Sequence, residues 1–98
     1  MGEQDIFPNG MRNDQLDNET IYTWFERLGY GDYGKAIDGT WYAKIPNGPH
    51  AGSHGNLKNH IVTEHEDGTI TVSPSILVEY GDGKSWHGYL EKGIWRTV

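Results

Sequence analysis

The chain has no cysteine among its 98 residues. It therefore has no disulfide bridge, no thiolate nucleophile and no cysteine-ligated zinc. Secreted domains of this size usually carry disulfides, so we expect a reducing compartment. No apolar stretch approaches the roughly 18 residues of a membrane span, and residues 1–20 lack the apolar core of a signal peptide. We expect no membrane association.

Basic residues are also scarce, with 8 Lys and Arg against 14 Asp and Glu and a formal net charge of −6. Nucleic-acid binding needs cations for phosphate contacts, so we do not expect it. The acidity concentrates near the N-terminus, and this segment shows no hydrophobic periodicity. We predict an acidic flexible arm over residues 1–15 and a single small domain over residues 16–98. The carboxylates that this region would present to a basic protein surface are Glu3, Asp5, Asp14 and Asp17.

One helix is predicted, over residues 17–28. Asp17 is a suitable N-cap, because its carboxylate can accept hydrogen bonds from the first-turn amides. Gly29 would end the helix in a left-handed conformation. The apolar stripe at helical spacing consists of Ile21, Trp24, Phe25 and Leu28.

The rest of the chain follows the period of two that is typical of strands. Residues 40–45 and 60–64 alternate in this way, and the Asp67-Gly68 pair indicates a type I′ hairpin turn. Pairing across that turn would place on one face Ile61, Thr63, Ile70 and Val72. The sequence thus predicts an α+β fold. Its N-terminal helix would pack on a small antiparallel β-meander of about five short strands, forming a sheet or an open barrel.

Two further regions attract attention. Pro74 has no amide proton and predicts a break in strand pairing, where the hydroxyls of Ser73 and Ser75 would satisfy freed backbone groups. Residues 46–59 form a long loop rich in Gly, Pro and Asn. The candidate metal ligands in and beside this loop are His50, His54 and His60. Exposed loop histidines are the simpler interpretation, so we predict no cofactor and no catalytic residue.

The final hairpin, residues 85–90 and 94–98, holds aromatic candidates for a contact surface. Alternation groups Trp95 with Thr97, so we expect Trp95 to be partly exposed. Exposed Trp and Tyr are over-represented among binding hot spots. The protein-binding candidates are Trp95, Tyr89, Tyr42 and, on the strand face of Tyr89, His87. The alternative is that these rings cover a thin sheet.

Residues 65–98 resemble the C-terminal part of small uncharacterised proteins of bacteriophages and prophages. The shared elements are the Asp-Gly turn, residues 73–77 (SPSIL), residues 86–90 (WHGYL) and the Gly-Ile-Trp ending at Trp95. The resemblance implies phage origin and a compact β domain, and it implies no activity. Members of that group often carry cysteines near the kink and the histidine; this chain has none, so a structural metal is not implied.

These observations predict a non-enzymatic phage accessory protein that binds a protein partner, as an inhibitor of a host enzyme or defence protein. One alternative is a virion accessory or capsid-decoration protein, and another is a small metal- or ligand-binding protein that uses the loop histidines. The expected location is the host cytoplasm or the virion. A thin sheet with exposed aromatic rings is also compatible with a homo-oligomer.

Overall fold

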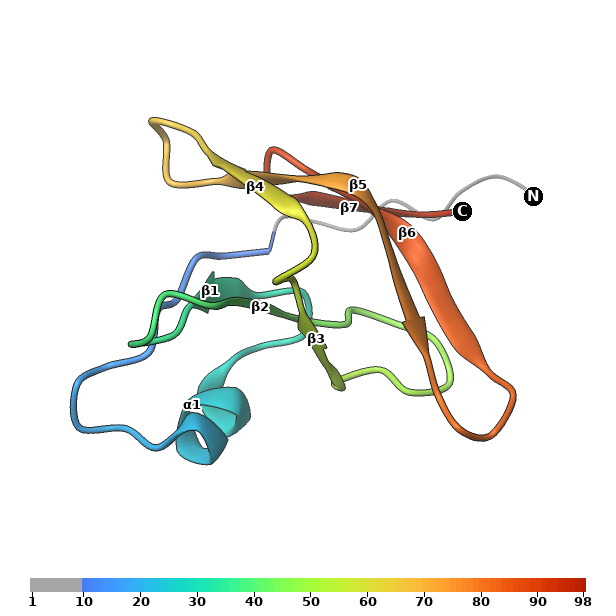
Figure 1. Cartoon of the computed structure of the whole chain (residues 1–98), viewed down its shortest axis with the longest axis horizontal. Helices are drawn as coiled ribbons and strands as arrows, with labels where there is room; N and C mark the ends of the chain where they lie inside the picture. The colour runs from blue at the N-terminus through green and yellow to red at the C-terminus, as the bar shows by residue number, and fades with distance from the viewer. Residues whose placement is uncertain (1–9) are drawn as a thin grey trace.

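The computed structural model describes residues 10–98, which form one short helix and two antiparallel sheets (Figure 1). The helix is α1 (Ile21–Arg27). The first sheet has the order β1-β2-β3, from β1 (Tyr33–Lys35), β2 (Trp41–Lys44) and β3 (His54–Asn56). The second has the order β4-β5-β6-β7, from β4 (Ile61–Glu64), β5 (Ile70–Glu79), β6 (Ser85–Glu91) and β7 (Ile94–Thr97). The described chain is therefore mostly β, and its strands form two sheets instead of the predicted single meander.

These elements are arranged in three layers, with the three-stranded sheet between α1 and the four-stranded sheet (Figure 1). Alternate residues of β2 point to opposite faces. Tyr42 accordingly packs with Trp24 and Leu28 of the helix layer, while Ala43 is buried between the sheets. The core between the sheets consists of Tyr33, Ala43, Ile45, Leu57, Ile70, Val72, Ile76, Trp86, Leu90 and Trp95.

The helix begins later than predicted. Its N-cap is Thr20, whose hydroxyl oxygen accepts a hydrogen bond from the Thr23 amide at 3.1 Å. Asp17 lies in the preceding turn, so the predicted Asp17 cap is wrong. At the other end the cap residue, Leu28, is already extended with ψ 134°. Gly29 therefore does not take the predicted left-handed conformation, although the predicted apolar stripe does pack on the sheet.

Residues 10–15, the last part of the predicted arm, lie along β1. The Tyr33 amide donates to the Met11 carbonyl at 3.2 Å, and the Asn13 amide donates to the Tyr33 carbonyl at 2.8 Å. The Trp24 indole N–H also donates to the Asn13 carbonyl, at 2.7 Å. This segment therefore extends the middle layer; residues 1–9 lie outside the described part of the chain.

The β4–β5 hairpin has a different register from the predicted one. The Gly68 amide donates to the His65 carbonyl, and Gly68 but not Asp67 has a positive φ, 88°. The loop is thus longer than the predicted type I′ turn. The pairing of β4 with β5 therefore shifts by one residue, and the alternate side chains of β4 exchange faces. Val62 pairs with Val72 and faces the core, whereas Ile61 points outward.

The predicted break at Pro74 is confirmed as a bulge inside one long strand. Val72 pairs with Leu90 and Ile76 pairs with Gly88, so β5 holds more residues than β6 over this stretch. The Ser73–Pro74 peptide bond within it is cis. Beyond the bulge, Ile76 is buried and Leu77 exposed, as the alternation predicts.

Candidate functional site

The side of the four-stranded sheet that faces away from the core is the candidate site. Val62, Val72, Leu90 and Trp95 form one row of paired residues on the core side. Their neighbours along each strand therefore point the other way. We call this surface the outer face and define it by Ile61, Ser75, Leu77, Glu79, His87, Tyr89, Glu91, Ile94 and Arg96.

The bulge in β5 sits at the middle of the outer face and joins three strands. The Ser75 hydroxyl is 2.8 Å from Nε2 of His87 on β6. The Ser75 carbonyl is 3.1 Å from Nε2 of His60, next to β4, and this nitrogen donates because a carbonyl oxygen only accepts. Nδ1 of His60 is buried and has no hydrogen-bond partner among residues 10–98. The predicted role of the Ser75 hydroxyl in satisfying backbone groups is thus wrong; it bonds to a side chain.

Tyr89 and Arg96 form the second centre of the outer face. They are directly paired across β6 and β7, and the Arg96 guanidinium lies 4.7 Å from the Tyr89 ring centroid. Arg96 also donates to the Glu91 carboxylate at 2.8 Å. Cation–π contact and ion pairing together hold the Tyr89 ring against the sheet.

Ser75 and His87 have the chemistry of a nucleophile and a base. A serine nucleophile also needs a group that orients the base. Among residues 10–98, no carboxylate forms a hydrogen bond with His87. The arrangement shows polar contacts that shape the outer face, and it lacks the third member of a triad.

Two predicted contact residues lie elsewhere. Trp95 is 0% exposed, and its indole N–H donates to the Gly31 carbonyl at 2.7 Å; the expectation of partial exposure is wrong. The reason is that the first sheet covers the face of β7 that carries Trp95. Tyr42 points from β2 toward α1 and is partly buried there, against Trp24 and Phe25. Tyr89 and His87 do lie on the outer face.

Of the predicted acidic contact residues, the two that the structure describes, Asp14 and Asp17, do not lie on the outer face. Asp14 lies 3.1 Å from Arg12 and accepts the Lys35 amide at 3.0 Å. Burial raises the pKa of Asp14, but the hydrogen bonds from Arg12 and Lys35 outweigh it and leave the pKa lowered. Asp17 is exposed in the turn before α1. Glu3 and Asp5 lie outside the described residues.

The three loop histidines occupy separate environments. His50 is 2.6 Å from Asp82 and stacks on Tyr80 with centroids 4.1 Å apart. His54 stacks on Phe25 at 3.9 Å, and burial, followed by Lys44, lowers its pKa. His60 faces the bulge. Within residues 10–98, no three His, Asp or Glu side chains are placed to share a metal ion.

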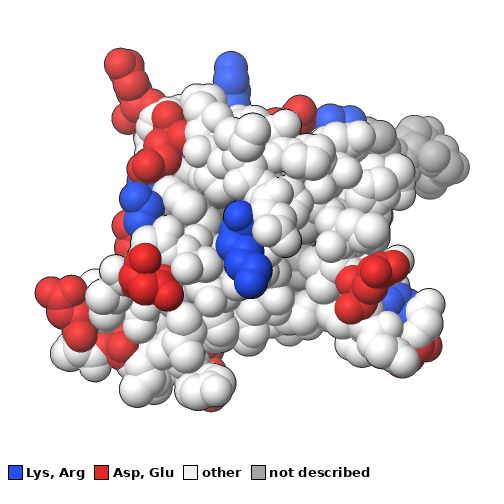
Figure 2. All heavy atoms as spheres, in the orientation of Figure 1, with Lys and Arg blue, Asp and Glu red and all other residues white. Residues whose placement is uncertain are grey.

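Charge is unevenly distributed over the surface. Figure 2 shows acidic side chains toward the margins of one broad side of the molecule and a basic side chain near its centre, surrounded by uncharged atoms. On the outer face Arg96 is paired with Glu91, while exposed Glu79 forms no ion pair with residues 10–98. The outer face thus carries exposed apolar side chains on β4, β5 and β7 and polar residues at its middle, and it is net acidic.

Sequence reasoning placed three residues of this site on the wrong side of the sheet. Ile61 was assigned to the wrong side because the hairpin register was off by one. Ile94 and Arg96 alternate with Trp95, so placing Trp95 inside would have found both. Trp95 pairs directly with Leu90 across the hairpin. Because paired residues share a face, recognising Leu90 as a core residue would have placed Trp95 in the core as well.

No family model, curated protein or solved structure matches the chain. Within residues 10–98, the helix is too short and too polar to cross a bilayer.

Proposed function

We propose that this chain is a non-enzymatic protein-binding module that contacts its partner through the outer face. One observation carries the proposal: Ile61, Leu77 and Ile94 are 70%, 53% and 43% exposed on the same side of one sheet. An antiparallel sheet with one side on the core usually presents polar residues to water on the other. These three side chains lie on β4, β5 and β7, and Tyr89 lies on β6, so every strand of the outer face carries a large side chain at or near the surface that a partner could contact.

The polar residues of the outer face support a protein as the partner. Tyr and Arg are enriched at protein interfaces and dominate their binding energy when they are held in place. Tyr89 and Arg96 are paired in this way next to the apolar residues. The Ser75 and His87 side chains add hydrogen-bonding groups that would be satisfied across an interface.

The acidic character of the chain indicates the chemistry of the partner. The formal net charge is −6, and on the outer face the Glu79 carboxylate forms no ion pair with any of residues 10–98. A complementary partner has apolar side chains that contact Ile61, Leu77 and Ile94 and a basic side chain beside Glu79. The resemblance to bacteriophage proteins makes a host enzyme or defence protein the first class to test, as for an inhibitor. A phage capsid or tail protein is the second class, as for a virion component.

The test is affinity capture of the tagged full chain from phage-infected cells, followed by binding measurements with the purified partner. We expect one stoichiometric partner, lost in Tyr89→Ala and in Leu77→Asp. Truncation of a hot-spot tyrosine should weaken binding by about 30-fold or more. Binding should also weaken as salt rises from about 0.05 to about 0.5 M, because charged rims are screened.

Tyr22→Ala is the matched control. Tyr22 is more exposed than Tyr89 and belongs to α1, on the opposite layer. Its truncation should leave binding unchanged. Loss of binding in the Tyr22 variant, together with retention in the Tyr89 and Leu77 variants, would place the contact surface on the helix layer and overturn the proposal.

A further inference from the structure

β4 is an edge strand of the four-stranded sheet. Its hairpin closes with a hydrogen bond from the His65 amide to the Thr69 carbonyl at 2.9 Å. Bonded and non-bonded pairs alternate along an antiparallel ladder. Thr63 therefore bonds to β5, whereas Val62 and Glu64 direct their backbone N–H and C=O groups away from it. Among residues 10–98, no strand pairs with that side.

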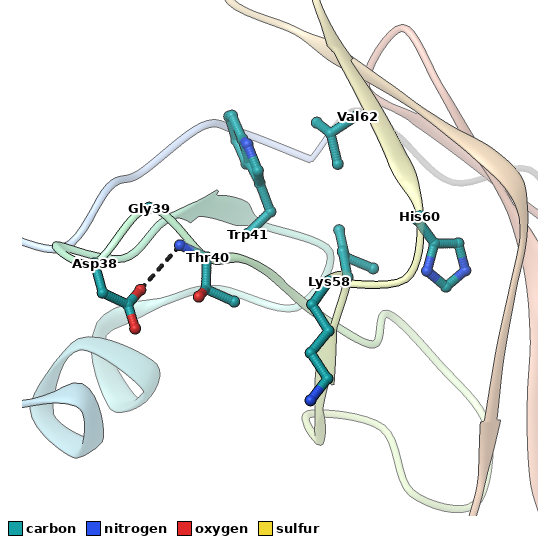
Figure 3. A pocket seen from close by; sticks show the side chains of 8 residues that line it. Asp38, Gly39, Thr40, Trp41, Lys58, His60 and Val62 are labelled. Carbon is teal, nitrogen blue, oxygen red and sulfur yellow. Dashed lines mark hydrogen bonds between the residues drawn. The ribbon is translucent and has the colours of Figure 1, made fainter.

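A hollow of about 370 Å³ lies beside this edge. Its lining comes from residues 38–41, from Leu57 and Lys58 after β3, and from His60 and Val62. Figure 3 shows Trp41 and Val62 on opposite sides of the hollow, while the His60 ring points away from it. Leu57 is buried, and Trp41 and Val62 are partly buried against the core. The hollow thus has a mixed lining, with apolar Trp41, Leu57 and Val62 beside polar and charged residues, next to the backbone groups of β4 that pair with no strand among residues 10–98.

The charged side chains at the hollow differ in their contacts. The Asp38 carboxylate accepts a hydrogen bond from the Thr40 amide at 2.9 Å. Lys58 is exposed and forms no ion pair with any of residues 10–98. A carboxylate on a bound segment would therefore form an ion pair with Lys58, whereas a basic side chain would be repelled by it.

We propose that β4 binds an extended segment of a partner protein as an additional strand. The segment carries an apolar side chain in the hollow and an acidic side chain beside Lys58. Alternate residues of a strand share a face. A residue opposite Val62 therefore points into the hollow, and the residue two positions away lies on the Lys58 side. The ligand class is an extended peptide with an acidic and an apolar residue two positions apart, held by main-chain hydrogen bonds as in β-augmentation. This edge is separate from the outer face, so the proposal does not rest on the one above.

The experiment selects short random peptides from a displayed library against the full chain and locates them by NMR. We expect enrichment of peptides with an acidic and an apolar residue two positions apart. Their binding should shift and protect the amides of Val62 and Glu64 and shift the Trp41 indole signal. N-methylation of the peptide bonds that face β4 should abolish binding, because the added strand then loses its donors.

Charge reversal tests the role of Lys58. Lys58→Glu should weaken the selected acidic peptides about threefold and favour the same peptides with lysine in place of the acid. Lys84→Glu, in the distant β5–β6 turn, is the matched control and should bind like the wild type. Tyr89→Ala should also bind normally, which separates this edge from the outer face. Absence of enrichment, shifts that avoid β4, or binding that survives N-methylation would each overturn the proposal.

Discussion

Gly34 shows how a single residue lets residues 10–15 join the middle layer. A Cβ at position 34 would lie 2.3 Å from the Asn13 carbonyl oxygen and 3.0 Å from the Trp24 ring. Contact this close between backbones is open only to a residue without a side chain. Gly34 thus allows residues 11–15 to pair with β1 and allows the Trp24 ring to pack against the same strand.

We therefore predict that Gly34→Ala lowers the free energy of unfolding by about 1–3 kcal/mol, the usual cost of overpacking. Urea denaturation followed by circular dichroism measures the change. The matched control is Gly55→Ala in β3 of the same sheet, where an added Cβ meets its nearest atom at 3.7 Å. That control should stay within about 1 kcal/mol of the wild type. Equal stability of the two variants would contradict the tight approach at Gly34.

At the scale of elements, α1 is attached to the chain before it by an ion pair. Arg27 donates to the two Glu19 carboxylate oxygens at 2.6 and 2.7 Å, and the Leu16 amide donates to the same carboxylate at 2.9 Å. The hydrogen bonds from Arg27, followed by the one from Leu16, lower the pKa of Glu19 from 4.5 to about 2. This contact stabilises the turn at residues 16–19 that comes before the helix, so the helix begins only after the N-cap Thr20.

The lowered pKa of Glu19 predicts a pH dependence with a definite sign. The carboxylate stabilises the folded state above about pH 4.5, and this contribution is lost as the pH falls toward 2. Glu19→Gln should therefore unfold at lower urea concentration than the wild type at neutral pH, with the difference shrinking between those pH values. Urea titrations from pH 2 to 7 measure it. Arg27→Ala should reproduce the loss, and a double variant that is much weaker than either single variant would argue against a shared interaction.

At the scale of the whole molecule, the middle sheet belongs to both hydrophobic clusters. Tyr42 packs with the helix layer, while its neighbour Ala43 packs with the four-stranded sheet. The Trp95 indole is bonded to Gly31, which follows the helix. Neither outer layer keeps its buried surface if the middle sheet unfolds, so the layers are expected to unfold together.

We predict a single cooperative transition for the full chain. Unfolding curves from far-ultraviolet circular dichroism, tryptophan fluorescence and the NMR signals of Trp24 and Trp95 should coincide within error. Trp24 reports on the helix layer and Trp95 on the core between the sheets. A Trp24 signal that changes well before the Trp95 signal would show that α1 unfolds on its own.

The sequence by itself determined the local features of this protein. The apolar stripe of α1, the position but not the type of the turn at Asp67-Gly68, the inward and outward alternation after Pro74 and the final hairpin all depend on contacts within a few residues of each other. For that reason periodicity and turn chemistry were enough to predict them. The outward position of Leu77 and the shared face of His87 and Tyr89 were predicted in the same way.

Only the tertiary structure decided the rest, because the deciding contacts join residues that are distant in sequence. The burial of Trp95 depends on Gly31, and the pairing of residues 11–15 depends on β1; neither contact leaves a periodic signal. The outward position of Ile61 depends on one extra residue in a hairpin loop, which composition alone does not reveal. Much of the outer face and the whole β4 edge follow from these contacts: layer packing buries one side of the sheet and leaves the other open.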